Sequence, residues 1–183
     1  MNPLLKKIDF SSLKVILLFG LIIRLVATFF SEGYGMHDDH FLVVEAAGSW
    51  ADGKDYNDWL PWNSPDGTPP EGHSFTYVGL NFLFFSILKF IGIADPKILM
   101  LLNRLVHALF SLLVIRYGYK ITEYLSDKKT AVLVGWTLAM LWAMPFLSVR
   151  NLVEVISMPF LTWRMWLCLS SSKMTSSLLY AGL

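Results

Sequence analysis

Apolar residues gather into long blocks along the chain, and the length of each block predicts its structure. Four blocks cover residues 13–30, 97–121, 129–149 and 151–170. At about 1.5 Å per helical residue, each block is long enough to cross most of a hydrocarbon core about 30 Å thick. The pattern therefore predicts four transmembrane helices over these ranges.

Two shorter helices are expected between the first two spans. Apolar positions recur at helical spacing over about 39–51, and residues 75–93 form a further apolar block. Lys89 favours an interfacial position for the second block, because a lysine can reach water there and is costly in mid-membrane. The alternative is that residues 75–93 cross the bilayer.

Basic residues indicate the topology. Three lysines near the N-terminus place residues 1–12 on the cytoplasmic side. If residues 75–93 stay at the outer interface, the basic residues between 116 and 129 also fall inside, as the positive-inside tendency requires. We therefore expect residues 31–96 to form one long extracytoplasmic loop that carries both shorter helices.

The last apolar segment, residues 176–183, is too short to cross a bilayer. It has the form of the start of a further transmembrane helix. We therefore expect the chain to be a truncated product or the N-terminal part of a longer protein. The fold class that the whole pattern predicts is an all-α polytopic membrane protein.

Composition agrees with this class. Hydrophobic residues make up 55% of the 183 residues, charged residues 16%, and the mean hydropathy is +0.51. A soluble domain carries about 25% charged residues. These values exclude most soluble and disordered classes, and no nucleic-acid partner is expected. The single Cys168 allows no internal disulfide and no cysteine metal cluster.

Charge is concentrated in the first loop. The net charge is +1, but nine of the fourteen acidic residues lie within 31–74, where Lys54 is the only Lys or Arg. Three of the four histidines, His37, His40 and His73, lie in the same stretch. Its tryptophans suit the aromatic belt of a membrane interface, with a platform for a sugar ring as the alternative. Most of the candidate catalytic and ligand-binding residues therefore lie in this loop.

Asp38 and Asp39 lie between His37 and His40, at the start of the short helix expected over 39–51. Either carboxylate could cap that helix by accepting backbone N–H bonds. One capping residue would suffice, however. Two adjacent carboxylates also suit a general base, or a divalent cation such as Mg²⁺ or Mn²⁺ held by Asp38, Asp39 and His40. The spacing leaves these roles open.

Two arginines lie inside predicted spans. Arg24 and Arg104 each sit about 9 Å below the outer edge of their helix. Charges inside a membrane are costly and usually face a partner or an interior site. The two arginines either pair with backbone carbonyls or reach outward, or they anchor a lipid phosphate. Arg150 occupies the next outer turn, and Glu154 follows it at the spacing of a helical ion pair.

These features together resemble the class C glycosyltransferases, above all the bacterial mannosyltransferase-like members related to families 22 and 39. The first-loop motif of family 22 reads His-Pro-Asp-Glu followed by an aromatic residue. The segment His37-Asp38-Asp39-His40-Phe41 has the histidine, the second aspartate and the aromatic residue of that motif, and departs from it at the other two positions. The later Ser148-Val149-Arg150-Asn151 resembles the Ser-Arg-Thr-x-Ser-Asn turn of the family.

The resemblance implies an inverting glycosyltransferase that takes its sugar from a polyprenyl-phosphate donor at the outer face of the membrane, in a bacterium the periplasmic face of the inner membrane. Asp39 or Asp38 would deprotonate the acceptor hydroxyl, and arginines would stabilise the lipid phosphate that leaves. The expected ligands of the phosphate and the substrates are Arg24, Arg104, Arg150, His37, His40 and His73. The donor and membrane lipids are the expected partners.

Two other hypotheses come from different classes. The first is a transporter or an ion-binding membrane protein. Transporters place ionisable residues near mid-membrane, often on interrupted helices, whereas the carboxylates of this chain cluster in a loop. The second is a truncated inactive product or an assembly subunit.

Overall fold

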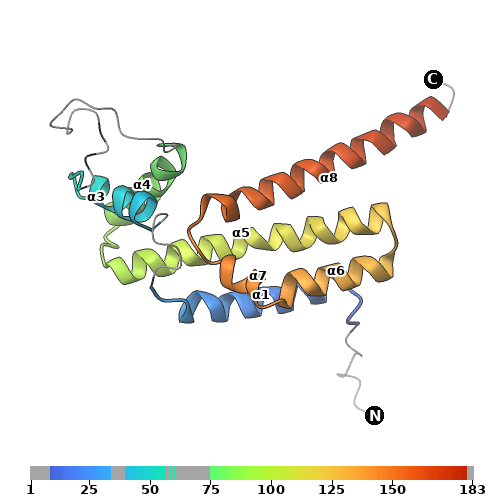
Figure 1. Ribbon diagram of the computed structural model, residues 1–183, viewed down its shortest axis with the longest axis horizontal. Helices are drawn as coiled ribbons and strands as arrows, with labels where there is room; N and C mark the ends of the chain where they lie inside the picture. Colours follow the sequence, from blue (N-terminus) through green and yellow to red (C-terminus); the bar gives the residue numbers. More distant parts are fainter. Residues whose placement is uncertain (1–8, 34–39, 57, 59, 61–74, 181–183) are drawn as a thin grey trace, which may run out of the picture. The chain divides into compact units, whose positions relative to one another are not determined.

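The computed structural model describes residues 9–33, 40–56, 58, 60 and 75–180, with side chains up to residue 171 (Figure 1). Every regular element within these residues is a helix, so the all-α class is confirmed for the described part of the chain. The chain divides into two compact units. The helical unit comprises Met1–Ser31, Leu105–Arg150 and Glu154–Leu183, and the loop unit comprises Glu32–Arg104 and Asn151–Val153.

The elements in chain order are α1 (Leu13–Phe30), a short π-helix η1 (His40–Glu45), α3 (Ala46–Ala51), α4 (Phe75–Phe90), α5 (Pro96–Leu125), α6 (Lys128–Met140), α7 (Ala143–Leu147) and α8 (Val153–Tyr180). Helices α1 and α5 are long and apolar enough to cross a membrane, and α4 is a shorter apolar helix. Helices thus occur where the first two spans and the two loop helices were expected.

A break divides the span expected at 129–149. Helix α6 ends at Met140, and the short α7 begins three residues later at Ala143. Pro145 gives the physical reason: in a continuous helix its ring would clash with the carbonyl of Leu141. Leu141 accordingly leaves the helical conformation, with φ −56° and ψ 122°.

The C-terminal helix also differs from the expected pattern. Helix α8 runs without interruption from Val153 to Tyr180, through the span expected at 151–170 and into the separate helix expected from residue 176. The residues between the two ranges include neither glycine nor proline, the two residue types that end helices most effectively. Residues 176–180 therefore continue α8.

Helices α1 and α5 of the helical unit run antiparallel, side by side (Figure 1). A Cβ on Gly20 of α1 would lie 2.7 Å from Cδ1 of Ile115 in α5, and one turn further along α1 the side chain of Arg24 bonds Ser111. Residue numbers thus increase along α1 in the direction in which they decrease along α5. If α1 crosses the membrane in one direction, α5 crosses it in the other.

Helix α6 runs parallel to α1 and lies against both α1 and α5. At Gly135 of α6, a Cβ would lie 3.1 Å from the ring of Tyr119 in α5 and 3.2 Å from Cδ1 of Ile16 in α1. One turn further, Ala139 meets Gly20. Small residues at such crossings let helix backbones approach closely, which is how helices associate in a membrane.

Helix α8 packs along α5 through aromatic contacts. The rings of Phe110 and Phe160 are 4.9 Å apart, edge to face. Further along both helices, Nζ of Lys120 lies 5.2 Å from the ring centroid of Trp166. The two contacts occur in the same order along both helices, so α8 runs parallel to α5.

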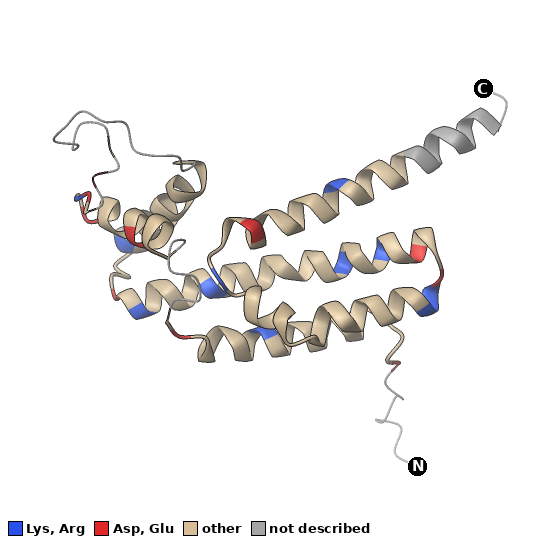
Figure 2. Ribbon diagram, viewed as in Figure 1, with Lys and Arg blue, Asp and Glu red and all other residues tan. Residues whose placement is uncertain are grey.

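Charged residues mark the connection between α5 and α6 (Figure 2). Asp127 caps α6 by accepting bonds from the backbone N–H groups of Lys129 at 2.7 Å and Thr130 at 3.0 Å. Its bonds to the backbone and hydroxyl of Thr130 hold the pKa of the Asp127 carboxyl below its usual value. Lys128 and Lys129 are the first two residues of α6 and precede its apolar run, which begins at Ala131.

The loop unit has its own apolar core, formed where α3 and η1 pack on α4 and the start of α5. The buried members are Val44, Ala46, Ala47, Val78, Phe85 and Leu99. Gly92 ends α4 in the left-handed conformation (φ +90°), and Ile93 N–H closes the turn on the carbonyl of Leu88 at 2.9 Å. Asp95 then caps α5, whose first residue is Pro96.

We expect Gly135→Val to destabilise the helical unit by about 1–3 kcal/mol, because the added methyl groups would enter space held by Tyr119 and Ile16. Thermal unfolding of the purified protein in detergent measures the change. Gly79→Val in α4 is the matched control, since a Cβ at Gly79 meets nothing within 4 Å. Equal unfolding temperatures for the two variants would contradict the close packing of α1, α5 and α6.

Candidate functional site

A groove of about 550 Å³ lies in the loop unit, where η1, α3, the end of α4 and the start of α5 meet. Val44, Phe85, Leu99 and Met100 supply its apolar lining. Its polar lining consists of His40, Glu45, Ser49, Asp52, Tyr56 and Lys89. A concave site with an apolar wall and a few placed polar groups has the usual make-up of a small-molecule site. We call it the ion-pair groove.

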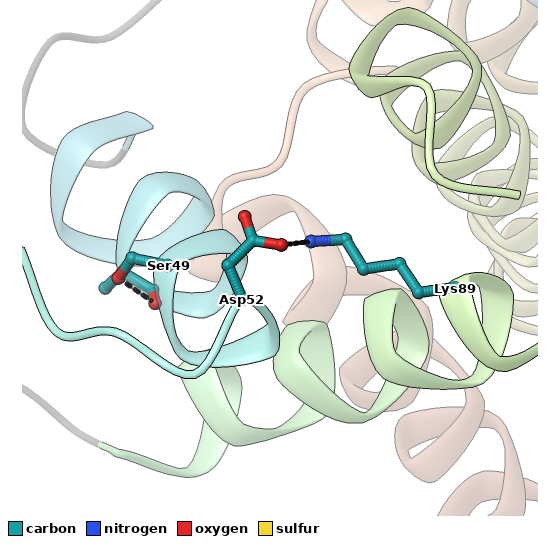
Figure 3. A network of polar contacts seen from close by, with 4 residues as sticks. Ser49, Asp52 and Lys89 are labelled. Atoms are coloured by element: carbon teal, nitrogen blue, oxygen red, sulfur yellow. Dashed lines mark hydrogen bonds and ion pairs between the residues drawn. The ribbon is translucent and has the colours of Figure 1, made fainter.

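Lys89 and Asp52 form an ion pair in the lining of this groove (Figure 3). Asp52 directly follows α3 and Lys89 lies in the last turn of α4, so the pair joins the ends of two helices. The Lys89 side chain is 20% exposed and that of Asp52 is 57% exposed. Ion pairs this accessible contribute about 0–1 kcal/mol to stability. The main effect of the Lys89–Asp52 pair is to place a cation beside an anion in the lining of the groove.

His40 and Glu45 contribute a second polar pair to the same groove. Nε2 of His40 lies 3.5 Å from Oε1 of Glu45, and the imidazole ring meets Phe41 edge to face at 5.4 Å. Both partners lie on η1, so one short π-helix presents them together. The imidazole is therefore held by a carboxylate on one side and an aromatic ring on another.

The other loop residues predicted to act, Asp38, Asp39, His37 and His73, lie outside the described residues. Asp39 immediately precedes His40 in the chain, so the predicted carboxylate pair is one and two residues from the groove lining in sequence. Within the part of the chain that the structure describes, no three His, Cys, Asp or Glu side chains gather as a metal site.

Arg24 is buried in the helical unit, 2% exposed, and its guanidinium donates to one hydroxyl and three backbone carbonyls. Nε donates to Ser111 Oγ at 2.8 Å, and Nη1 donates to the carbonyl of Gly20 at 3.2 Å. The remaining bonds reach α6: Nη1 to the carbonyl of Ala139 at 3.3 Å and Nη2 to that of Leu138 at 3.1 Å. Arg24 thus shows the pairing with backbone carbonyls that was one of its two expected roles.

The position of these carbonyls explains why an arginine is needed. Leu138 and Ala139 lie in the last turn of α6, where the break at Leu141 leaves carbonyls without helical donors. Arg24 is buried beside them, and a buried carbonyl left without a donor is costly. Arg24 therefore acts as a cap for α6 supplied by a neighbouring helix. Its role as a phosphate ligand stays a prediction.

The other two arginines belong to different units. Arg104 is half-buried on α5 and belongs to the loop unit. Arg150 is half-buried in the turn after α7, and its guanidinium carbon lies 4.7 Å from the ring centroid of Phe146. An arginine held over an aromatic ring is oriented by a cation–π contact. The part each plays toward a phosphate stays a prediction.

Three asparagines of the loop unit form a hydrogen-bonded cluster that the sequence interpretation did not identify. Asn81 Oδ1 accepts from Asn103 Nδ2 at 2.9 Å and from Asn151 Nδ2 at 2.6 Å. Asn81 Nδ2 donates to the carbonyl of Tyr77 at 2.9 Å, within α4. The sequence does contain a signal for this cluster: Asn81 and Asn103 each lie inside an apolar block. A polar residue buried in such a block needs a hydrogen-bond partner, so the two could have been predicted to pair.

Comparison with known families matches residues 15–182 to the Alg9-like mannosyltransferase family. The match spans nearly the whole chain, so the protein belongs to this family, and the resemblance to family 22 is confirmed at the family level. Together with two helices able to cross a bilayer, membership makes it a membrane glycosyltransferase of the mannosyltransferase type. No curated protein and no solved structure gives a significant match.

We expect Arg24→Met to lower the free energy of unfolding by about 2–4 kcal/mol, because two carbonyls of α6 would lose their donors while an unbranched apolar stem is kept. Arg24→Lys should lose less, and the exposed Arg164→Met should lose almost nothing. Unfolding in detergent measures all three. If Arg24→Met kept wild-type stability but lost sugar transfer, phosphate binding rather than capping would be its role.

Proposed function

We propose that the protein transfers a hexosyl residue, mannosyl in the first instance, from a polyprenyl-phosphate donor to an acceptor hydroxyl on the outer face of the membrane. The observation that carries the proposal is the family match over residues 15–182. The acidic first loop, with its groove and its predicted carboxylate pair, supports an active site on the loop side of the membrane.

The reaction requires a base and a stabilised leaving group. Asp39, or Asp38, accepts the proton of the acceptor hydroxyl as its oxygen attacks the anomeric carbon of the donor sugar. The bond between that carbon and the phosphate oxygen breaks, and the electron pair leaves on the polyprenyl phosphate. Attack from the opposite face inverts the anomeric configuration. A phosphate leaving group needs no strong general acid.

Two arginines of the chain suit the leaving phosphate. Arg104 and Arg150 are the stronger candidates to stabilise it, because the guanidinium of Arg24 is committed to helix carbonyls. His40, which lines the ion-pair groove, would bind and orient a substrate through its imidazole, as would His37 and His73 from the same loop. A divalent cation at Asp38, Asp39 and His40 is the second role for these residues, and oxygen ligands suit Mg²⁺ or Mn²⁺.

The antiparallel packing of α1 and α5 supports the proposed topology. A chain that leaves through α1 and returns through α5 has its whole 31–96 segment on one side, so α4 lies at the interface. Helix α4 is about 24 Å long at 1.5 Å per residue, shorter than the hydrocarbon core. The cytoplasmic side then receives the basic connection between α5 and α6.

Cysteine labelling tests this topology. In a Cys168→Ser background, an impermeant thiol reagent should label Glu32→Cys in intact cells and Ser126→Cys only after permeabilisation. Both positions are exposed, so access differs only through the side of the membrane. Labelling of both cysteines in intact cells would contradict the proposal that α4 stays at the interface.

The catalytic prediction concerns the carboxylate pair. In membranes of cells that express the gene, Asp39→Asn should lower transfer from polyprenyl-phosphate mannose by about 10²–10⁴-fold, since an amide cannot take up the acceptor proton. Asp38→Asn should cost less, and Asp9→Asn, which lies before α1, serves as the control.

The readout is product formed per amount of inserted protein, measured with EDTA and with added Mg²⁺ or Mn²⁺. Transfer that survives EDTA assigns the pair to proton transfer rather than to metal binding. If Asp38→Asn abolishes transfer and Asp39→Asn does not, the base is Asp38. Wild-type transfer by both variants would refute the proposed function.

A further inference from the structure

We propose that a second cleft of the loop unit is a saccharide-binding subsite for the acceptor. This cleft, about 710 Å³ and open to solvent, lies beside the turn that follows α3, on residues distinct from the ion-pair groove except for Tyr56. Its lining includes Trp50, Lys54, Asp55, Tyr56 and Phe82. The choice of a sugar as ligand rests on the proposed function. The evidence for a built cleft is the set of contacts that its lining residues make. We call it the aromatic cleft.

Aromatic rings give the cleft faces that suit a sugar ring. The indole of Trp50 is stacked on Phe75 at 6.1 Å with an interplanar angle of 17°, and Phe82 meets it edge to face at 6.4 Å. Aromatic faces carry negative charge density, and the C–H groups on the face of a pyranose are weakly positive. A pyranose therefore packs on such rings better than on an aliphatic wall.

Hydrogen bonds fix the orientation of the tryptophan. Trp50 Nε1 donates to Asp55 Oδ1 at 2.9 Å, and the backbone N–H of Leu60 donates to Asp55 Oδ2 at 2.8 Å. Asp55 is thus the anchor of both the indole and the turn. A ring that is already oriented loses little conformational entropy when a ligand packs on it. A tryptophan of a membrane interface typically directs its N–H toward water or headgroups, whereas this one is bonded within the protein.

The turn itself supplies donors for hydroxyl groups. Gly53 adopts a left-handed conformation (φ +71°), and Lys54 N–H returns to the carbonyl of Ser49 at 2.9 Å. This brings Lys54 Nζ to 5.5 Å from the ring centroid of Tyr56. The hydrogen bond to Tyr56 and the nearby Asp52 raise the pKa of Lys54, so its ammonium stays charged and can donate to sugar oxygens.

Charge and chemistry select a neutral polyhydroxylated ligand. The lining of the cleft holds one carboxylate, Asp55, and one ammonium, Lys54, so it offers no net positive charge to an anionic phosphate. A lipid chain finds a better match in the ion-pair groove, whose wall carries Val44, Phe85, Leu99 and Met100. A sugar uses both features of the aromatic cleft: its C–H face meets the rings and its hydroxyls meet Lys54 and the Tyr56 hydroxyl.

Saturation-transfer NMR with methyl α-mannopyranoside tests the subsite on the whole chain in detergent, with no lipid donor present. Tyr56 is the residue to change, because its side chain is 69% exposed and lies outside the apolar core. We expect saturation transfer to the ring protons of the mannoside. Tyr56→Ala should weaken binding about three- to tenfold, which is the loss of one ring contact.

Two controls make the result specific. Tyr56→Phe keeps the ring and should retain most of the affinity, and Tyr124→Ala, on α5 in the helical unit, should bind as wild type does. Cyclohexanol, a ring without the hydroxyl pattern, should show no dependence on Lys54→Met, whereas mannoside binding should weaken. No saturation transfer to the mannoside, or equal affinity for Tyr56→Ala and wild type, would overturn the proposal.

The outcome is separable from that of the proposed function. Tyr56 lines both concave sites, whereas Lys54 lines only the aromatic cleft. If mannoside binding depends on both Tyr56 and Lys54 and no sugar transfer is found in membranes, the subsite stands and the transferase proposal fails. If transfer occurs and Tyr56→Ala leaves the acceptor KM unchanged, the transferase proposal stands and the subsite is refuted.

Discussion

The helical unit depends on one constraint: a buried backbone that stops being helical must still have its polar groups satisfied. Helix α6 stops at Met140 because of Pro145, and the carbonyls that this break exposes are taken by Arg24 from α1. The same arginine bonds Ser111 of α5, so one guanidinium joins three helices. Small residues at the crossings then allow these helices to approach closely enough for those bonds to form.

Both candidate sites described lie in the loop unit. Two concave sites border the turn after α3, one lined by an ion pair and an aliphatic wall, the other by aromatic rings and a charged turn. Tyr56 is shared by both linings. Under the proposed function, one site would bind a lipid-linked sugar and the other a polar acceptor, and the two linings differ as these substrates do. Membership of a family of transferases also weakens the transporter hypothesis.

The sequence predicted the helices better than their ends, and the residue types of the site better than their contacts. Block length and periodicity predict α1, α5 and the loop helices, because the local pattern of apolar residues determines where these helices form. The break at Leu141 depends on the clash between the ring of Pro145 and the carbonyl of Leu141. Hydropathy averaged over the whole block does not reveal such a clash. Arg24 was recognised as unusual, but its partners on other helices lie 87 to 115 residues away, and no local pattern reveals such contacts. The same limit hid the asparagine cluster.

The asparagine cluster imposes an order of assembly on the loop unit. Asn81 and Asn103 are synthesised with the rest of that unit, but their third partner, Asn151, follows only after α6 and α7. At about 5–20 residues per second, the interval between Arg104 and Asn151 takes about 2–9 s. During that time the loop unit lacks one of its hydrogen-bonded segments. Completion of the first loop is therefore timed by the insertion of helices that come later in the chain.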